Sequence, residues 1–244
     1  MVQTKQRLSK SSLLKLSALG FLNVVISMLL LQFAIYYGKA SLTAIIVSMN
    51  PLFVSVFAIF FLKEKLNRIQ LISLFVGIAG LILIIFGEGE LYQHRYLNLP
   101  LGILCAILAC ITFALYTVLT KRLIAQHGNL VTNSFAFLIG GLLLSIINFA
   151  LGKTMLFEAT LHNLGIMLYL GAVISGLAYL LYFEAMKQLS AATASIYFFL
   201  KPALASLLAY LFLSEHLQIL QISGIILVML ALSRNLYFRR ISQP

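Results

Sequence analysis

Residues Ala40–Gln70 read ASLTAIIVSMNPLFVSVFAIFFLKEKLNRIQ, and residues Ala191–Gln221 read AATASIYFFLKPALASLLAYLFLSEHLQILQ. The two segments align without a gap at an offset of about 151 residues. Each has a proline in the middle of an apolar run, followed by a Glu-x-Leu-x-x-x-Gln motif. Apolar runs match by chance, but polar landmarks rarely recur in register. The alignment therefore indicates an internal duplication.

The composition around these segments is that of a membrane protein. The 244 residues are 62% hydrophobic and only 9% charged, whereas soluble domains are about 45–50% apolar and about 25% charged. The net charge of +11 comes from short basic clusters between apolar runs. Such clusters are typical of cytoplasmic loops, so we expect no nucleic-acid partner.

The apolar runs predict an all-α polytopic bundle of about eight transmembrane helices, because a span needs about 20 apolar residues. The predicted spans are Leu16–Tyr37, Ala40–Leu62, Ile69–Phe86, Leu101–Thr120, Leu130–Leu151, Leu164–Met186, Ala191–Leu213 and Leu217–Leu236. Lysines and arginines favour one set of alternate loops. This places both termini in the cytoplasm, and the short loops favour a cell (inner) membrane.

The two copies of the repeat then have opposite orientations. Glu64 falls in an inside loop and Glu215 in an outside loop. Inverted repeats are typical of secondary transporters, whose substrate site lies near the midplane between the copies. The copies are unequal: residues 12–87 hold three helices and residues 100–237 hold five. Counterparts of the first two helices of the second copy are missing, so we expect either a shortened chain or a partner that supplies them.

Several short segments resemble the EamA repeat of the drug/metabolite transporter superfamily. They are Ala40–Ala44 (ASLTA), Asn50–Phe53 (NPLF) and Lys63–Leu66 (KEKL), with Ala191–Ser195 (AATAS), Lys201–Leu204 (KPAL) and Ser214–Leu217 (SEHL). The resemblance implies a ten-helix exporter of amino acids, metabolites or drugs, built from two inverted five-helix repeats. This chain would hold helices three to ten of that plan. Helix one, which helps to wall the cavity in the family, is missing from it.

Lys201 is the leading candidate for a functional residue. It lies halfway along a predicted span, where a cation costs at least about 2.5–3.5 kcal/mol and needs a partner or a wet cavity. It could bind an anionic substrate group or carry a proton; alternatively, it is a structural lysine tied to backbone carbonyls or to Glu184. Pro202 and its counterpart Pro51, which follows Asn50, predict kinks with free backbone carbonyls near the midplane.

Four further residues are weaker candidates for binding substrate or protons. Tyr179 and Tyr197 lie well inside their spans, as does Gln32. Glu184 is either a gate or a surface partner of Lys187 one turn later. Pairs of small residues at Gly77–Gly80, Ala172–Gly176 and Ala205–Ala209 predict close helix packing.

The sequence favours a secondary transporter that exports a small metabolite, amino acid or drug by alternating access. The alternative is a truncated remnant or an assembly subunit that does not transport. The chain has no Asp, and its His and Cys residues are not grouped. We therefore expect that the protein is not an enzyme and that it has no cofactor and no metal site. The expected partners are the lipid bilayer and a small-molecule substrate, with a second copy or a helical partner as further candidates.

Overall fold

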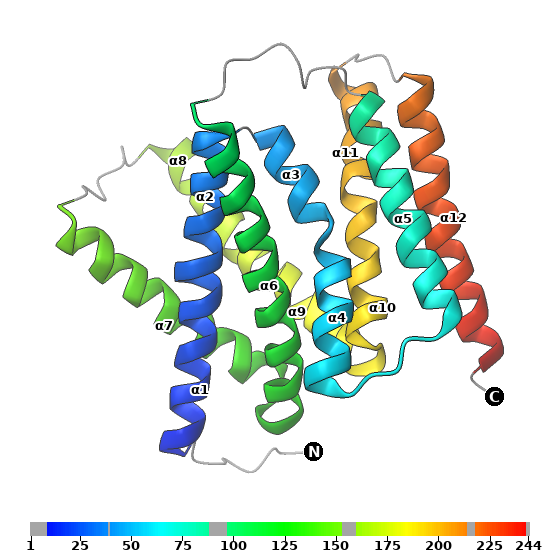
Figure 1. Ribbon diagram of the computed structural model, residues 1–244. Helices are drawn as coiled ribbons and strands as arrows, with labels where there is room; N and C mark the ends of the chain where they lie inside the picture. Colours follow the sequence, from blue (N-terminus) through cyan, green and yellow to red (C-terminus); the bar gives the residue numbers. More distant parts are fainter. Residues whose placement is uncertain (1–8, 39, 88–96, 153–159, 214–217, 243–244) are drawn as a thin grey trace.

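The computed structural model describes residues 9–38, 40–87, 97–152, 160–213 and 218–242 (Figure 1). These residues form eight successive helical spans, four of them subdivided by local changes in helix type or by a turn. The first three spans are α1 (Lys10–Gly20), η1 (Phe21–Ser27) and α2 (Met28–Tyr37); α3 (Ala40–Ser48) and α4 (Asn50–Leu62); and α5 (Arg68–Gly87).

The remaining five spans follow in the same way. They are α6 (Leu99–His127); α7 (Asn129–Ala150); α8 (Leu161–Leu168), η3 (Tyr169–Leu177) and α9 (Ala178–Gln188); α10 (Ala191–Ile196), η4 (Tyr197–Phe199) and α11 (Leu200–Leu213); and α12 (Ile219–Ser242). The predicted helical membrane fold is confirmed. Four continuous segments are long and apolar enough to cross a membrane: Lys10–Tyr37, Leu99–His127, Asn129–Ala150 and Leu161–Gln188.

Short polar side chains fix where several helices begin. Ser9, Asn98, Thr160 and Ser190 each accept a hydrogen bond from the backbone N–H three residues later. Such caps satisfy donors that the first turn of a helix leaves without a partner. Helices also extend beyond the predicted apolar runs. α6 continues to His127, because hydropathy marks only the hydrocarbon core and not the helix in the interface.

The helices repeat at a constant offset of 151 residues. α1 and α8 begin at Lys10 and Leu161, and α2 and α9 end at Tyr37 and Gln188. The same offset relates α3 to α10 and α5 to α12 at their first residues, and α4 to α11 at their last residues. Both η1 and η3 are π-helical. α4 ends at the face of the bundle where α1 begins, and α11 ends at the opposite face (Figure 1), so the copies are inverted.

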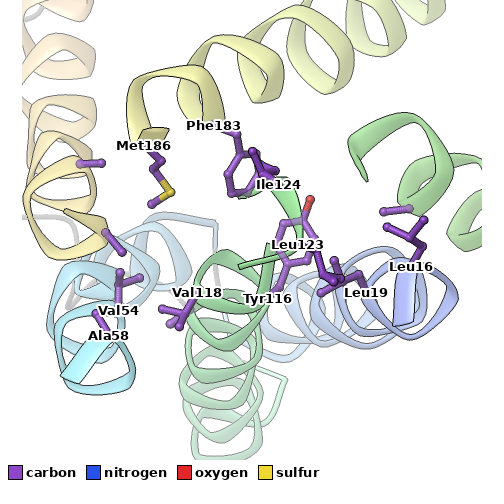
Figure 2. Packing of buried hydrophobic residues seen from close by; sticks show 14 residues of the cluster. Leu16, Leu19, Val54, Ala58, Tyr116, Val118, Leu123, Ile124, Phe183 and Met186 are labelled. Atoms are coloured by element: carbon purple, nitrogen blue, oxygen red, sulfur yellow. The ribbon is translucent and has the colours of Figure 1, made fainter. Parts of the chain in front are cut away.

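Two regions of tight packing hold the bundle together. The larger core joins α1, α4, α6 and α9 around residues such as Leu19, Val54, Tyr116 and Phe183 (Figure 2). α5 and α12 lie side by side (Figure 1). A Cβ on Gly80 would lie 2.8 Å from the backbone oxygen of Gly224, so glycine allows these two backbones to meet.

The small-residue pairs predicted to mediate packing have different outcomes. Gly77 and Gly80 lie against other helices, as predicted. In the Ala172–Gly176 pair, a Cβ on Gly176 would contact only the backbone oxygen of Gly171 in its own helix. The side chains of Ala205 and Ala209 lie outside the described residues, as does Glu215.

Candidate functional site

Both spans that carry a central proline are interrupted just before it. α3 ends at Ser48 and Met49 forms a turn, whereas Tyr197–Phe199 forms a short 3-10 helix. Proline has no N–H, so the carbonyl four residues earlier loses its donor. In the first copy this carbonyl belongs to Val47 and accepts a hydrogen bond from Cys110 Sγ at 3.9 Å. Helix α6 therefore satisfies polar backbone that the interruption sets free.

Asn50, which precedes Pro51, also contacts α6. Its side chain is fully buried, and its Nδ2 donates a hydrogen bond to the backbone oxygen of Cys110 at 3.2 Å. Its Oδ1 has no hydrogen-bond partner. Asn50 thus holds α4 against α6, and only its amide oxygen remains for a ligand.

Lys201, which precedes Pro202, is placed differently. Its side chain is exposed, and its Nζ lies 4.0 Å from the centre of the Phe198 ring. A cation over an aromatic face gains about 0.5–2 kcal/mol, depending on how far it is desolvated. None of the ion pairs in the described part of the chain involves Lys201. Its ammonium group therefore lies over a ring, and its side chain is not covered by the described helices.

Phe198 belongs to a cluster of aromatic rings from four spans. Its ring stacks on that of Tyr182, with centroids 5.0 Å apart and planes at 20°, and it lies 6.1 Å from the ring of Phe113. The ring of Tyr179 belongs to the same group, and its centroid lies 4.9 Å from that of the Phe137 ring. We call the following set the aromatic cluster: Phe113, Tyr116, Phe137, Tyr179, Tyr182, Phe183 and Phe198. Lys201 lies at its edge.

A chain of hydrogen bonds joins this cluster to Glu184 near the end of α9. Asn129 Nδ2 donates to Glu184 Oε2 at 2.9 Å, and Asn133 Nδ2 donates to Asn129 Oδ1 at 2.6 Å. The hydroxyl of Tyr116 then contacts Asn133 Oδ1 at 3.4 Å. These polar side chains, which we call the polar path, run from the end of a span into the bundle.

Asn23 extends the polar side of the cluster from η1. Its side chain is buried and lies close to the hydroxyls of Tyr116 and Tyr179. Neither atom of its amide forms a hydrogen bond of good geometry, but both tyrosine hydroxyls are close enough to interact with it. Its position between two tyrosines suits a group that forms hydrogen bonds with a ligand.

A second polar group closes the face of the bundle where α4 ends and α10 begins. Glu64 accepts hydrogen bonds from the backbone N–H of Ala191, at 2.9 Å to Oε2, and forms an ion pair with Lys121 at 2.8 Å. Lys121 Nζ also donates to the backbone oxygen of Leu189. Gln70 donates to Thr193 Oγ1 at 2.7 Å. We call this group the Glu64 junction. It joins the two copies of the repeat.

The remaining predicted residues do not gather at one place. Glu184 pairs with Lys187 at 2.8 Å, as the surface interpretation expected, rather than with Lys201. Gln32 is exposed on α2, and Tyr197 packs in a separate core with Met49 and Leu52. The described residues contain no group of three His, Cys, Asp or Glu side chains that could hold a metal ion.

Sequence reasoning missed the polar residues that the fold brings together. Asn23, Asn129 and Asn133 each sit near apolar stretches, and an asparagine there is itself a signal of a buried polar contact. Glu64 was noted only as a landmark of the repeat. As the sole acid in a basic loop, it was a reasonable candidate for an ion pair.

The helical fold, the inverted repeat and an exposed lysine inside a span define a polytopic membrane protein of the transporter class. The profile of the EamA-like transporter family matches residues 1–86 and 100–236. The chain belongs to this family. An "Uncharacterized transporter" of Clostridium kluyveri is 37% identical over 227 residues, which are 93% of this chain and 73% of that protein.

Further comparisons agree with this family. Protein PecM of Dickeya dadantii is 30% identical over 220 residues, covering 89% of this chain and 72% of PecM. A crystal structure with 16% identity superposes with a TM-score of 0.78, covering 98% of this chain and 80% of the other. At that identity the likeness concerns the fold alone. Together with the family match, these relatives identify the chain as a multi-pass membrane transporter.

Proposed function

We propose that the protein is a secondary transporter that exports a small metabolite, amino acid or drug across the cell membrane by alternating access. The observation that carries the proposal is Lys201, an accessible cation within a span, held over Phe198 beside the aromatic cluster. A charge at such a depth is retained for a ligand or an ion rather than for stability. The substrate would place an anionic group on Lys201 and an apolar part against the rings.

The inverted repeat supports alternating access. We assign residues 12–87 and 100–237 to the two copies, whose helices match at a constant offset. Two copies of one unit can exchange roles, so that the site opens to one side and then to the other. The Glu64 junction closes one end of the bundle. Glu215, its equivalent by sequence, would close the other end when Glu64 releases.

The basic residues support the orientation. The end of α6 and the loop that follows α4 lie at the face where α1 begins and α12 ends (Figure 1). We place this face in the cytoplasm, because lysine and arginine concentrate on that side of membrane proteins.

The experiment uses everted vesicles from the native host, incubated with a mixture of amino acids and small carboxylates. Uptake of each compound is measured by mass spectrometry against vesicles that lack the protein. Lys201→Ala is expected to lower uptake about tenfold, because a charged hydrogen bond worth about 1.5 kcal/mol is lost. Lys201→Arg keeps the charge, and Lys187→Ala is the matched control for a surface lysine.

Two results would count against the proposal. Undiminished uptake by correctly inserted Lys201→Ala would remove the role of Lys201. If vesicles with the wild-type protein took up none of the compounds above background, transport of this substrate class would be contradicted.

A second candidate function is a subunit that transports only with a helical partner. The observation that favours it is the α8–η3 span, which α6 and α7 leave uncovered. In this case Lys201 has the same role, but the cavity is completed by helices from outside these residues.

A further inference from the structure

The hydrogen bonds of the polar path run in one direction only. Asn129 Nδ2 donates to the backbone oxygen of Leu180 at 2.8 Å and to Glu184 at 2.9 Å. Asn133 Nδ2 donates to Asn129, at 2.6 Å to Oδ1 and at 3.2 Å to the backbone oxygen. Backbone carbonyls and carboxylates only accept hydrogen bonds, and an amide side chain has one donor end and one acceptor end. These fixed acceptors therefore set the orientation of both asparagine amides.

This direction determines where the neighbouring tyrosines place their protons. Asn133 Oδ1 can only accept, so the hydroxyl of Tyr116 donates its one proton to it. The oxygen of Tyr116 is then an acceptor for Asn23. The orientation that satisfies this chain turns the amide nitrogen of Asn23 toward Tyr116 and its amide oxygen toward Tyr179, the two tyrosines between which it lies. Tyr179 thus directs its proton at Asn23 and keeps an oxygen lone pair as an acceptor for the aromatic cluster.

Tyr182 brings a second hydroxyl to the same place. It follows Tyr179 by three residues on α9, so the two side chains share one face of the helix. Its ring stacks on that of Phe198 with centroids 5.0 Å apart, and the ammonium group of Lys201 lies 4.0 Å from the centre of the Phe198 ring. The Tyr182 hydroxyl is buried and has no hydrogen-bond partner among the described residues. Leaving a buried hydroxyl unpaired is costly, so this group points to a ligand that pairs with it.

Of the common polar groups, a hydroxyl satisfies both tyrosines. It can donate to the oxygen of Tyr179 and accept the proton of Tyr182, whereas an ammonium group only donates and an aliphatic carbon does neither. An ammonium group in the bundle would also need a carboxylate. Both glutamates in the described part of the chain are already paired with lysines. The cluster therefore favours an uncharged hydroxyl beside the anion.

We propose that Tyr182 determines substrate specificity: its hydroxyl binds a hydroxyl group of a substrate whose carboxylate lies on Lys201. The preferred substrates are therefore hydroxycarboxylates with an apolar part, rather than plain carboxylates or amino acids. This inference rests on the proposed function, which assigns the anionic group to Lys201, and it adds the second polar group of the substrate. Buried hydroxyls become reachable when the spans separate during alternating access.

The test uses three probes with one carbon skeleton: leucic acid (the hydroxy analogue of leucine), isocaproate and leucine. Uptake of each probe is measured in everted vesicles. Its affinity for the purified protein is measured by the shift in thermal unfolding in detergent. For the wild type, leucic acid is expected to exceed isocaproate about tenfold in both measurements, because two neutral hydrogen bonds are gained. Leucine should bind no better than isocaproate.

Two tyrosine variants make the test specific. Tyr182→Phe removes only the hydroxyl and keeps the ring on Phe198. It is expected to reduce the preference for leucic acid over isocaproate from about tenfold to about twofold. Tyr169→Phe is the matched control, because Tyr169 is 56% exposed on η3 and does not belong to the aromatic cluster. The control should keep the preference within about twofold of the wild-type value.

Three results would overturn this inference. They are equal wild-type responses to leucic acid and isocaproate, a wild-type preference for leucine, and a Tyr182→Phe variant that keeps the wild-type preference. The two readouts separate this inference from the proposed function. If the protein binds leucic acid in preference but moves none of the probes, the proposed function is contradicted and the assignment of Tyr182 is supported.

Discussion

Replacing Glu64 by alanine is expected to loosen the contact between the two copies of the repeat at the end of the bundle where they meet. The carboxylate of Glu64 accepts the backbone N–H of Ala191 and pairs with Lys121. Alanine leaves that N–H without its acceptor at the start of α10. Lys121 keeps only its bond to the backbone oxygen of Leu189.

The size of the effect follows from the burial of the pair. The side chains of Lys121 and Glu64 are 21% and 15% exposed, whereas those of Lys187 and Glu184 are 42% and 57% exposed. A hydrogen bond to a charged group in a partly buried place contributes about 1.5–3 kcal/mol. We therefore expect Glu64→Ala to destabilise the closed contact by about 2 kcal/mol, roughly a thirtyfold rise in the opened population. Lys187→Ala removes an exposed pair worth about 0.5 kcal/mol and should change it about twofold.

Hydrogen–deuterium exchange of the Ala191 amide, measured by mass spectrometry in nanodiscs, reports this opening directly. The exchange rate of this amide should rise by the factors given above. In Glu64→Gln the exchange rate should lie between those of the alanine variant and the wild type, because an uncharged acceptor forms a hydrogen bond about half as strong. An acceleration below about threefold in Glu64→Ala, or equal effects in Glu64→Ala and Lys187→Ala, would refute the assignment of the Glu64 junction as the contact that holds this end closed.

Two further variants test packing and polarity inside the bundle. Gly20→Leu should destabilise the protein by about 3 kcal/mol, because its side chain meets the backbone of α7. Gly141→Ala, at a helical position with no atom within 4 Å, should instead raise stability by up to about 1 kcal/mol in thermal unfolding in detergent. Asn23→Leu should raise stability by about 1 kcal/mol, since it removes a buried amide whose hydrogen bonds have poor geometry, yet lower uptake in the vesicle assay. If stability fell and uptake were unchanged, Asn23 would be a structural residue only.

The spans and the repeat could be predicted because both leave local signals in the sequence. Apolar runs of the length of a bilayer predict helices, and the paired Pro51 and Pro202 with their following glutamates set the register of the two copies. Helix ends were less predictable. Residues such as Lys121 continue a helix beyond the apolar run, and hydropathy does not distinguish a helical interface residue from a loop residue.

The contacts between spans could not be predicted in the same way. Within a membrane, apolar residues suit both lipid and protein neighbours, so hydropathy does not reveal which face of a helix is covered. For this reason Glu64 was seen as a landmark but not as a partner of Ala191 and Lys121, which lie far along the chain. The same limitation hid the polar path, because its asparagines come from separate helices.

The two copies also show why Lys201 is accessible. Lys201 and Asn50 occupy equivalent positions before the two prolines. Asn50 is buried because α6 packs against it and accepts its hydrogen bond. Lys201 is instead exposed, and among the described contacts its ammonium group lies over the ring of Phe198.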